Sequence, residues 1–164
     1  MISRSAFGRL VYVHNDKLGL TLTYSRLWRQ FTDFCIEMEW IESTDKWEEA
    51  SAELPTELPT WIVVWISDKC DDRDMYTALP KDPSVHRATY SHAQKMRAAI
   101  SHKFGRDFGL GAQPWQQNPL MEKFLGNPSV SVLVGQYMIS LRHRKVCFLS
   151  DVVYCHLKVN NLLI

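Results

Sequence analysis

Apolar residues recur every three and four positions from residue 23 onward, which is the spacing of one face of an α-helix. The pattern predicts an amphipathic helix over residues 24–40, with Thr23 as its N-cap. Its apolar positions are Tyr24, Leu27, Trp28, Phe31, Phe34, Cys35 and Met38. The next stretch, 42–59, is rich in Glu and Thr and closes with two Leu-Pro pairs, so we expect an exposed connection there.

Residues 61–70 are apolar on most sides, and periodicity does not separate a buried strand from a buried helix over so few residues. A helix is favoured because it separates an apolar side, with Trp61 and Trp65, from the polar pair Asp68-Lys69. The polar stretch 71–83, interrupted by two prolines, predicts a loop.

A third apolar stripe predicts a helix that is capped by Ser84 or by Thr89 and that ends near Phe104. Its apolar positions are Tyr90, Ala93, Met96, Ile100 and Phe104. Three glycines and Pro114 then stop the helix and begin a long loop, for which Trp115 is a candidate anchor.

The pair Asn127-Pro128 supplies an N-cap and a proline at the first helical position, which predicts a last helix over residues 128–142. Its apolar positions are Val130, Leu133, Val134, Tyr137, Met138 and Leu141. The basic run 142–145 ends this helix, where the helix dipole favours cations. The run therefore has a structural explanation beside any functional one.

The two ends of the chain resist assignment. In residues 1–20, Leu10 to Val13 fit a short strand or the approach to a helix, and Asn15-Asp16 fits a turn. The apolar, β-branched tail 146–164 fits a strand, a short helix or an extension foreign to the domain. Both ends stay unassigned, and residues 21–145 are predicted to form one helical domain.

Composition agrees with a single globular domain. The chain has 164 residues, 46% of them hydrophobic and 23% charged, and its six tryptophans predict an aromatic-rich core. Its longest apolar stretch is too short to cross a bilayer and its start has no signal-peptide pattern, so we expect an intracellular protein. The four cysteines form no Cys-x-x-Cys pair, which favours buried thiols over a disulfide framework or a zinc finger.

Charge is distributed unevenly along the chain, although the net charge is only +1. Residues 1–85 carry nine Lys and Arg against fifteen Asp and Glu, whereas residues 86–145 carry nine against two. Such asymmetry indicates an anionic partner for the basic part, or pairing of the two parts within the fold.

On a helix with about 100° per residue, the third predicted helix places a basic stripe opposite its apolar stripe. Small residues such as Ala99 lie between the cations and would permit close approach of a phosphate backbone. The predicted nucleic-acid-binding residues are Arg87, Ser91, His92, Lys95, His102, Lys103 and Arg106, joined by Arg142, Arg144 and Lys145 after the last helix. A solvated face without a partner is the alternative. Arg97 points toward the apolar side, so we expect it to be partly buried and paired.

Enzyme motifs are missing from the sequence. It has no Gly-x-Ser-x-Gly elbow, Walker loop, dinucleotide glycine pattern or His-Glu-x-x-His. The acidic residues 68–74 lack the glycine and final Glu of an EF-hand, which favours an exposed loop. The candidate zinc ligands His143, Cys147, Cys155 and His156 follow no standard spacing. We therefore expect no metal, no cofactor and no small-molecule substrate.

Several of these segments together resemble a known family. Thr23-Tyr24 followed by Trp28 and by Phe31-x-x-Phe34-Cys35 is similar to the opening helix of the core-binding domain of tyrosine recombinases and phage-type integrases. The apolar segment 61–69, the Thr89-Tyr90-Ser91 helix start, the Gly- and Pro-bearing loop and Asn127-Pro128 follow in the family's order. Residues 86–145 resemble the transposon-derived, Crypton-type recombinases of fungi in particular.

This resemblance implies an all-α fold, a four-helix SAM-like bundle over residues 21–145 that binds double-stranded DNA, and a nuclear location. The family's catalytic domain follows the last helix, but here only the tail 146–164 follows, and Tyr154 has no visible activating residues. We therefore expect a DNA-binding module and not an enzyme. The alternative is a degenerate or protein-interaction helical domain, with self-association as one form of it.

Overall fold

A computed structural model describes residues 4–45, 47, 54–120 and 122–145, and within these it describes side chains from residue 21 onward. The helices in this part are α1 (Arg4–Glu37), α3 (Leu58–Cys70), α4 (Tyr90–His102) and a helix over residues 132–145. A π-helical turn, η1 (Lys103–Asp107), continues α4, and a 3-10 turn, η2 (Pro128–Val130), precedes the 132–145 helix. Strands β1 (Gln116–Gln117) and β2 (Phe124–Leu125) pair antiparallel. The described chain is mainly helical, as the sequence predicts.

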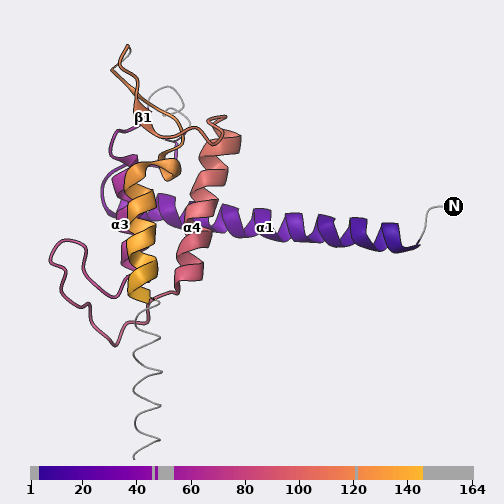
Figure 1. Ribbon diagram of the computed structural model, residues 1–164, viewed down its shortest axis with the longest axis horizontal. Coiled ribbons are helices and arrows are strands. Elements are labelled where there is room, and N and C mark those ends of the chain that lie inside the picture. The colour runs from indigo at the N-terminus through magenta and orange to yellow at the C-terminus, as the bar shows by residue number, and fades with distance from the viewer. Residues whose placement is uncertain (1–3, 46, 48–53, 121, 146–164) are drawn as a thin grey trace, which may run out of the picture.

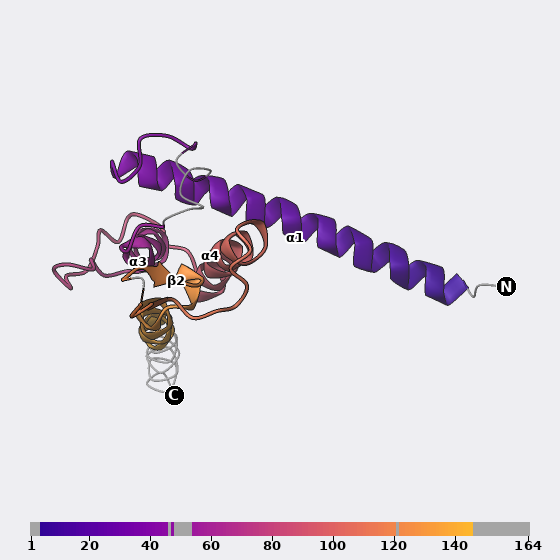
Figure 2. The same ribbon diagram turned by 90° about the horizontal axis from the view of Figure 1, so that it is seen from above.

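The helices form three layers (Figure 2). α1 lies on one side, α3 and α4 lie in the middle, and the 132–145 helix lies on the other side. In Figure 1, α1 crosses the other helices and its N-terminal half extends past α4, on the side away from α3. Of the helices within the described residues, none has the length and apolar character needed to cross a membrane.

α1 begins far earlier than the predicted residue 24, so two predictions for this region are wrong. Asn15-Asp16 lies inside the helix and is not a turn. Thr23 is not an N-cap, because its Oγ1 donates a hydrogen bond of 2.9 Å to the carbonyl of Gly19, one turn earlier. A Thr hydroxyl can bond either to a free N–H at a helix start or to the preceding turn, and sequence alone does not distinguish the two.

α1 ends at Glu37 rather than at residue 40, because the chain reverses there. Glu39 adopts a left-handed φ of 59°. The Trp40 N–H donates to the Cys35 carbonyl and the Glu39 N–H donates to the Ile36 carbonyl, each at 2.9 Å, which is the Schellman arrangement. The Trp40 ring then packs edge-on against Phe34, at 5.8 Å between centroids, and fixes the exit direction of the chain.

The two middle helices agree with the sequence predictions. α3 is a helix and not a strand, and it is buried on nearly all sides, which explains why its periodicity is weak. α4 is capped by Thr89, whose side chain accepts from the His92 N–H, so Thr89 and not Ser84 is the cap. The predicted stripe faces the core: Ala93, Met96, Ile100 and Phe104 are buried, and Tyr90 is partly buried.

The Asn127 side chain connects three segments by hydrogen bonds near the C-terminal end of α4. It is fully buried and donates to the carbonyls of Ser101 at 3.0 Å and Gly111 at 3.1 Å. Its Oδ1 accepts from the N–H and the hydroxyl of Ser129, so Asn127 caps η2, and Ser131 Oγ accepts from the Val134 N–H at the start of the 132–145 helix. The predicted helix 128–142 is therefore two elements with two caps.

The long loop contains the β1–β2 hairpin, which the sequence did not predict. Trp115 is buried and stacks on Phe124 at 5.6 Å, so its anchoring role is confirmed. Leu133, predicted on the apolar stripe of the last helix, is instead exposed. The tail 146–164 lies outside the described residues.

Gly126 is expected to be essential for this loop. Its φ is +102°, and a Cβ there would lie 2.2 Å from the carbonyl oxygen of Pro114. Gly126→Ala should therefore lower the free energy of unfolding by about 3 kcal/mol, measured by urea denaturation. Gly135→Ala is the matched control, because a Cβ there meets nothing within 4 Å and alanine favours a helix. Similar stabilities of the two variants would contradict the predicted strain.

Cys35 and Cys70 are expected to be inert in the folded protein. Both are buried, and burial raises the pKa of the Cys35 thiol to about 12 and that of Cys70 to about 11. Above about pH 9 the unfolded chain loses these protons first, so stability should fall as the pH rises toward 11. Iodoacetamide should modify the two thiols only in urea, as peptide mass spectrometry would show; rapid modification in the folded state would argue against this burial.

Candidate nucleic-acid interface

The outward face of α4 and η1 carries two exposed cations, Lys95 and Arg106. Neither forms an ion pair or hydrogen bond through its side chain with another residue in the described part of the chain. Arg106 lines a shallow depression of about 410 Å³ together with His102 and Ala98. Because Lys95 lies one turn before Ala98 on the same helix, the two cations border one surface.

One side of the predicted basic stripe is covered by α1, which corrects the expected role of Ala99. Ala99 is 1% exposed, so its small side chain lets α1 approach α4 and leaves no room for a phosphate backbone. His102 is half-buried, and its ring lies 5.3 Å from that of Tyr24 of α1. The free face of α4 is therefore narrower than the stripe predicted from the sequence.

Two further predicted residues lie along the contact with α1. His92 is partly buried and lines a hollow with Gln30 and Asp33 of α1. Lys103 pairs with Asp107 at 2.8 Å, and its Nζ lies 5.6 Å from the centre of the Trp28 ring. Lys103 is thus already balanced by a carboxylate and an aromatic face.

Arg87, which precedes α4, and Arg97, which lies within it, both bind main-chain carbonyls. Arg87 donates to the carbonyl of Asp68 at 2.7 Å, near the end of α3. Arg97 is partly buried and donates to the carbonyl of Ser129 at 3.1 Å, which confirms the pairing expected for it. Arg87 therefore satisfies the C-terminal end of a helix, a favourable place for a cation.

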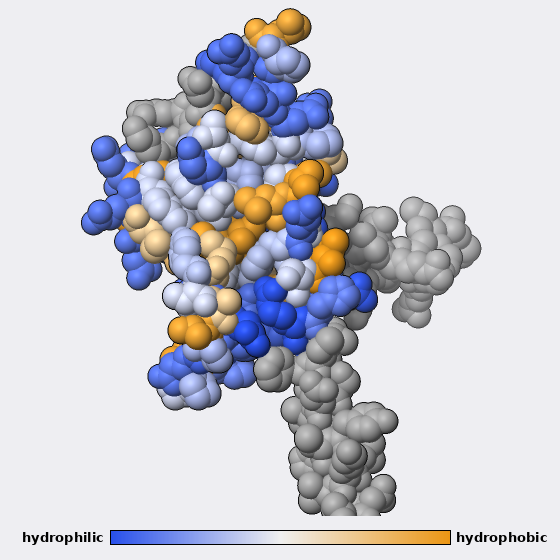
Figure 3. Space-filling view, turned by 60° about the vertical axis from the view of Figure 1, so that its left-hand side comes forward, coloured by the Kyte–Doolittle hydropathy of each residue, from blue (hydrophilic) through white to orange (hydrophobic). Residues whose placement is uncertain are grey.

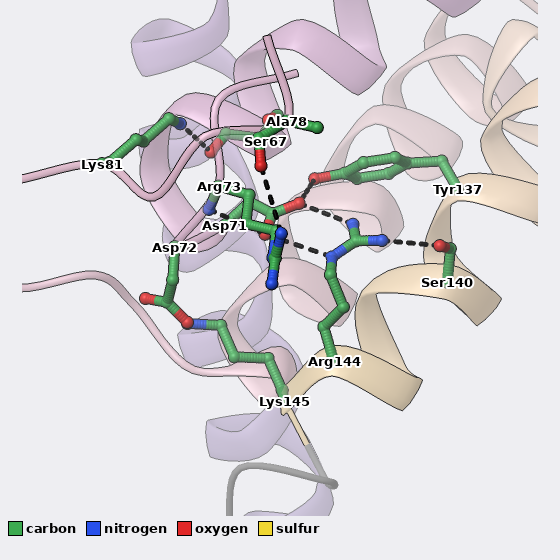
Figure 4. A network of polar contacts seen from close by, with 10 residues as sticks. All are labelled: Ser67, Asp71, Asp72, Arg73, Ala78, Lys81, Tyr137, Ser140, Arg144 and Lys145. Carbon is green, nitrogen blue, oxygen red and sulfur yellow. Dashed lines mark hydrogen bonds and ion pairs between the residues drawn. The ribbon is translucent and has the colours of Figure 1, made fainter. Parts of the chain in front are cut away.

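The basic run after the last helix meets the acidic loop after α3 (Figure 4). Asp71 is 4% exposed and accepts from Arg144 Nη2 at 2.6 Å, Arg144 Nε at 3.3 Å and Tyr137 Oη at 3.0 Å. Arg144 also donates to Ser140 Oγ. This set, which we call the Asp71 clamp (Asp71, Tyr137, Ser140 and Arg144), fastens the 132–145 helix to α3.

Protonation equilibria support the Asp71 clamp. Burial raises the pKa of Tyr137, and the adjacent Asp71 carboxylate raises it further, so the phenol remains a donor. Burial by itself would lower the pKa of Arg144, but the hydrogen bonds to Asp71, the negative charge of Asp71 and the contact with Tyr137 together outweigh that effect and raise it. Arg144 therefore binds the Asp71 carboxylate through two charge-assisted hydrogen bonds, from Nε and Nη2.

The remaining residues of the basic run divide into paired and free. Lys145 pairs with Asp72 at 2.6 Å. Arg142 and His143 are exposed and make no ion pair with another described residue. The pairing of acidic and basic parts within the fold, one of the two interpretations of the charge asymmetry, thus occurs at 71–72 and 144–145.

Sequence reasoning missed the role of Asp71 and the cations of α1. The sequence predicts Asp71 in an exposed acidic loop. No local signal connects it to Arg144, its partner 73 residues away. Arg26 and Arg29 are exposed on α1, and Arg29 lines a pocket with His102 and Lys103 of α4 and η1. The apolar pattern of α1 predicts which of its residues face the core, but it does not indicate a role for the cations on its polar face.

The described residues contain no group of three or more His, Cys, Asp or Glu side chains placed to hold a metal ion. Tyr154 and the candidate zinc ligands Cys147, Cys155 and His156 lie outside the described residues. No family model, curated protein or solved structure matches the chain. The candidate interface therefore rests on its own geometry.

Asp71→Asn is expected to lower the free energy of unfolding by about 2 kcal/mol, because it leaves the half-buried Arg144 guanidinium without its counter-charge. Asp72→Asn, whose carboxylate is 47% exposed, is the matched control and should cost less than about 1 kcal/mol. Urea denaturation at neutral pH measures both. Equal losses would show that the clamp is no more stabilising than a surface ion pair.

Proposed function

We propose that this chain is a DNA-binding module that contacts duplex phosphates through the outward face of α4 and η1. The observation that carries the proposal is the pair of exposed cations, Lys95 and Arg106, for which the described chain supplies no carboxylate. When unpaired cations of a protein neutralise DNA phosphates, the counterions condensed on the DNA are released, and this release drives association.

The order of elements supports an origin in the core-binding half of a tyrosine recombinase or integrase. A helix carrying the Thr23-Tyr24 motif, an apolar helix, a Thr-capped helix, a Gly-bearing loop and an Asn-Pro start follow one another as in that family. We propose on this basis a SAM-like, non-catalytic, transposon-derived module that acts in the nucleus.

The ten predicted contact residues differ in how accessible their side chains are to a phosphate. Ser91, Lys95, Arg106 and Arg142 are exposed, and His102 is half-buried against Tyr24. Arg87, Lys103, Arg144 and Lys145 already hold partners within the fold, and His92 faces α1. A cation that must leave an internal partner gains less from a phosphate, so the first group should carry the binding.

Protein interaction is the second candidate function, and one observation favours it. Val132, Leu133 and Ile139 are exposed on the 132–145 helix, at 73%, 44% and 61%. Figure 3 shows apolar side chains between hydrophilic ones on the face that it draws. Apolar side chains grouped on one helix can mark a contact with a second protein or a second copy.

The DNA proposal is tested with the double variant Lys95→Glu/Arg106→Glu. We expect duplex binding, measured by fluorescence anisotropy, to weaken at least tenfold, and the slope of log K against log salt to fall by about 2. Lys69→Glu/Arg73→Glu changes the charge equally, on α3 and its following loop, and should bind almost as the unchanged protein does.

Three results would contradict the proposal: no duplex binding by the unchanged protein, binding that is independent of salt, or equal losses in both double variants. Light scattering on the same samples addresses the alternative. Concentration-dependent dimers that Ile139→Asp abolishes, without DNA binding, would favour protein interaction.

A further inference from the structure

A pocket of about 610 Å³ opens where α1 crosses the junction of α4 and η1. Residues of α1 form one side, Thr44 and Trp47 form a second, and the third is formed by Ala99, His102, Lys103, Asp107 and Phe108. Its volume falls in the range of roughly 300 to 1,000 Å³ typical of small-molecule sites. The pocket borders the depression at Arg106, since Tyr24 and His102 line both, but neither Lys95 nor Arg106 lines the pocket.

Four aromatic side chains, Tyr24, Trp28, Trp47 and Phe108, line part of this pocket. The Trp28 ring lies 5.1 Å from that of Trp47 and 6.4 Å from that of Phe108. Tyr24 lines the same space and packs against His102. Trp28 and Phe108 are only half-buried, so they retain ring surface that a flat ligand can cover.

Two buried polar atoms in the pocket residues have no partner in the described chain. Thr32 Oγ1 and Trp47 Nε1 make no hydrogen bond, although Thr32 is 3% exposed and Trp47 is 5% exposed. Buried polar groups are nearly always satisfied, and an orphaned donor is costly. A hydroxyl and an indole N–H together suit the polar edge of a ring that carries hydrogen-bond acceptors.

Cations stand at the rim of the pocket. Arg29 is exposed and makes no ion pair with a described residue, and Lys103 lies over the Trp28 and Phe108 rings. Lys103 is paired with Asp107. Arg29, in contrast, has no carboxylate partner among the described residues. An anionic group attached to a ring in the pocket would find this guanidinium nearby.

We infer that the pocket binds a planar heteroaromatic ring that carries a phosphate, which is the chemistry of a nucleoside monophosphate. The aromatic side chains stack the ring, Thr32 and Trp47 bind its polar edge, and Arg29 meets the phosphate. The inference departs from the expectation of no small-molecule ligand, and it does not depend on duplex binding by α4. The ligand can be a free mononucleotide or one nucleotide of a single strand.

The test is calorimetric titration of the full chain with adenosine 5′-monophosphate, adenosine and ribose 5-phosphate. We expect saturable binding of the monophosphate, about tenfold weaker binding of adenosine, and no binding of the sugar phosphate. Arg29→Gln should remove the preference for the monophosphate over adenosine. A single-stranded oligonucleotide that competes with the monophosphate would identify a strand as the source, and failure to compete would identify the free nucleotide.

Thr32→Val keeps the shape of its side chain and deletes the unpartnered hydroxyl, whereas Trp47→Phe deletes the indole N–H together with part of a buried ring. Each should weaken binding of the monophosphate about tenfold. Thr32→Val should do so without lowering stability, since the deleted hydroxyl makes no internal hydrogen bond. Trp47→Phe should also lower the free energy of unfolding, because it removes part of a buried ring. Trp61→Phe is the control, because Trp61 stacks on Trp40 and does not line the pocket.

Three results would overturn the inference. These are no saturable binding of the monophosphate, unchanged binding in Thr32→Val and Trp47→Phe, or binding of ribose 5-phosphate equal to that of the monophosphate. The Lys95→Glu/Arg106→Glu variant should bind the monophosphate normally. Failure of this inference is therefore distinguishable from failure of the proposed duplex binding.

Discussion

Aromatic packing between three segments that are distant in sequence holds the domain together. Phe31 of α1, Trp65 of α3 and Phe104 of η1 have no exposed surface, and the Phe31 and Trp65 rings lie 5.2 Å apart. Trp28 extends the contact to Phe104 at 5.7 Å. Burial of one such ring contributes about 2 to 3 kcal/mol, and each ring pair adds about 0.5 to 1.5 kcal/mol. This packing fixes where α1 crosses α4, and so decides which side of α4 is left to solvent.

The helices could be predicted from the sequence wherever an apolar stripe or a cap marked them. The stripe of α4 and its Thr89 cap are local signals, and both appear in the structure. The start of α1 could not be located, because a Thr hydroxyl that bonds backward resembles one that caps a helix. The hairpin was missed because its strands have two residues each, too few for a periodic pattern.

The candidate site could be predicted only in part. The sequence places Lys95 and Arg106 on the polar side of α4, and both are exposed. It does not show that α1 covers Ala99, because the neighbour of a small residue is a property of tertiary packing. Nor does it show that Asp71 holds Arg144, since an ion pair across 73 residues leaves no periodic trace. Contacts between residues close in the chain could be predicted from the sequence, whereas pairings between distant residues could not.

The π-helical winding of η1 makes backbone register a determinant of the surface. The Phe108 N–H bonds to the Lys103 carbonyl, five residues back, so this turn holds one residue more than an α-helical turn would. Deleting a single residue here would restore ordinary α-helical winding and change the direction in which each remaining side chain of this turn points. The direction of the guanidinium at position 106 is thus encoded in the length of the segment as much as in the identity of its residues, and a related chain one residue shorter would present a different face with the same composition.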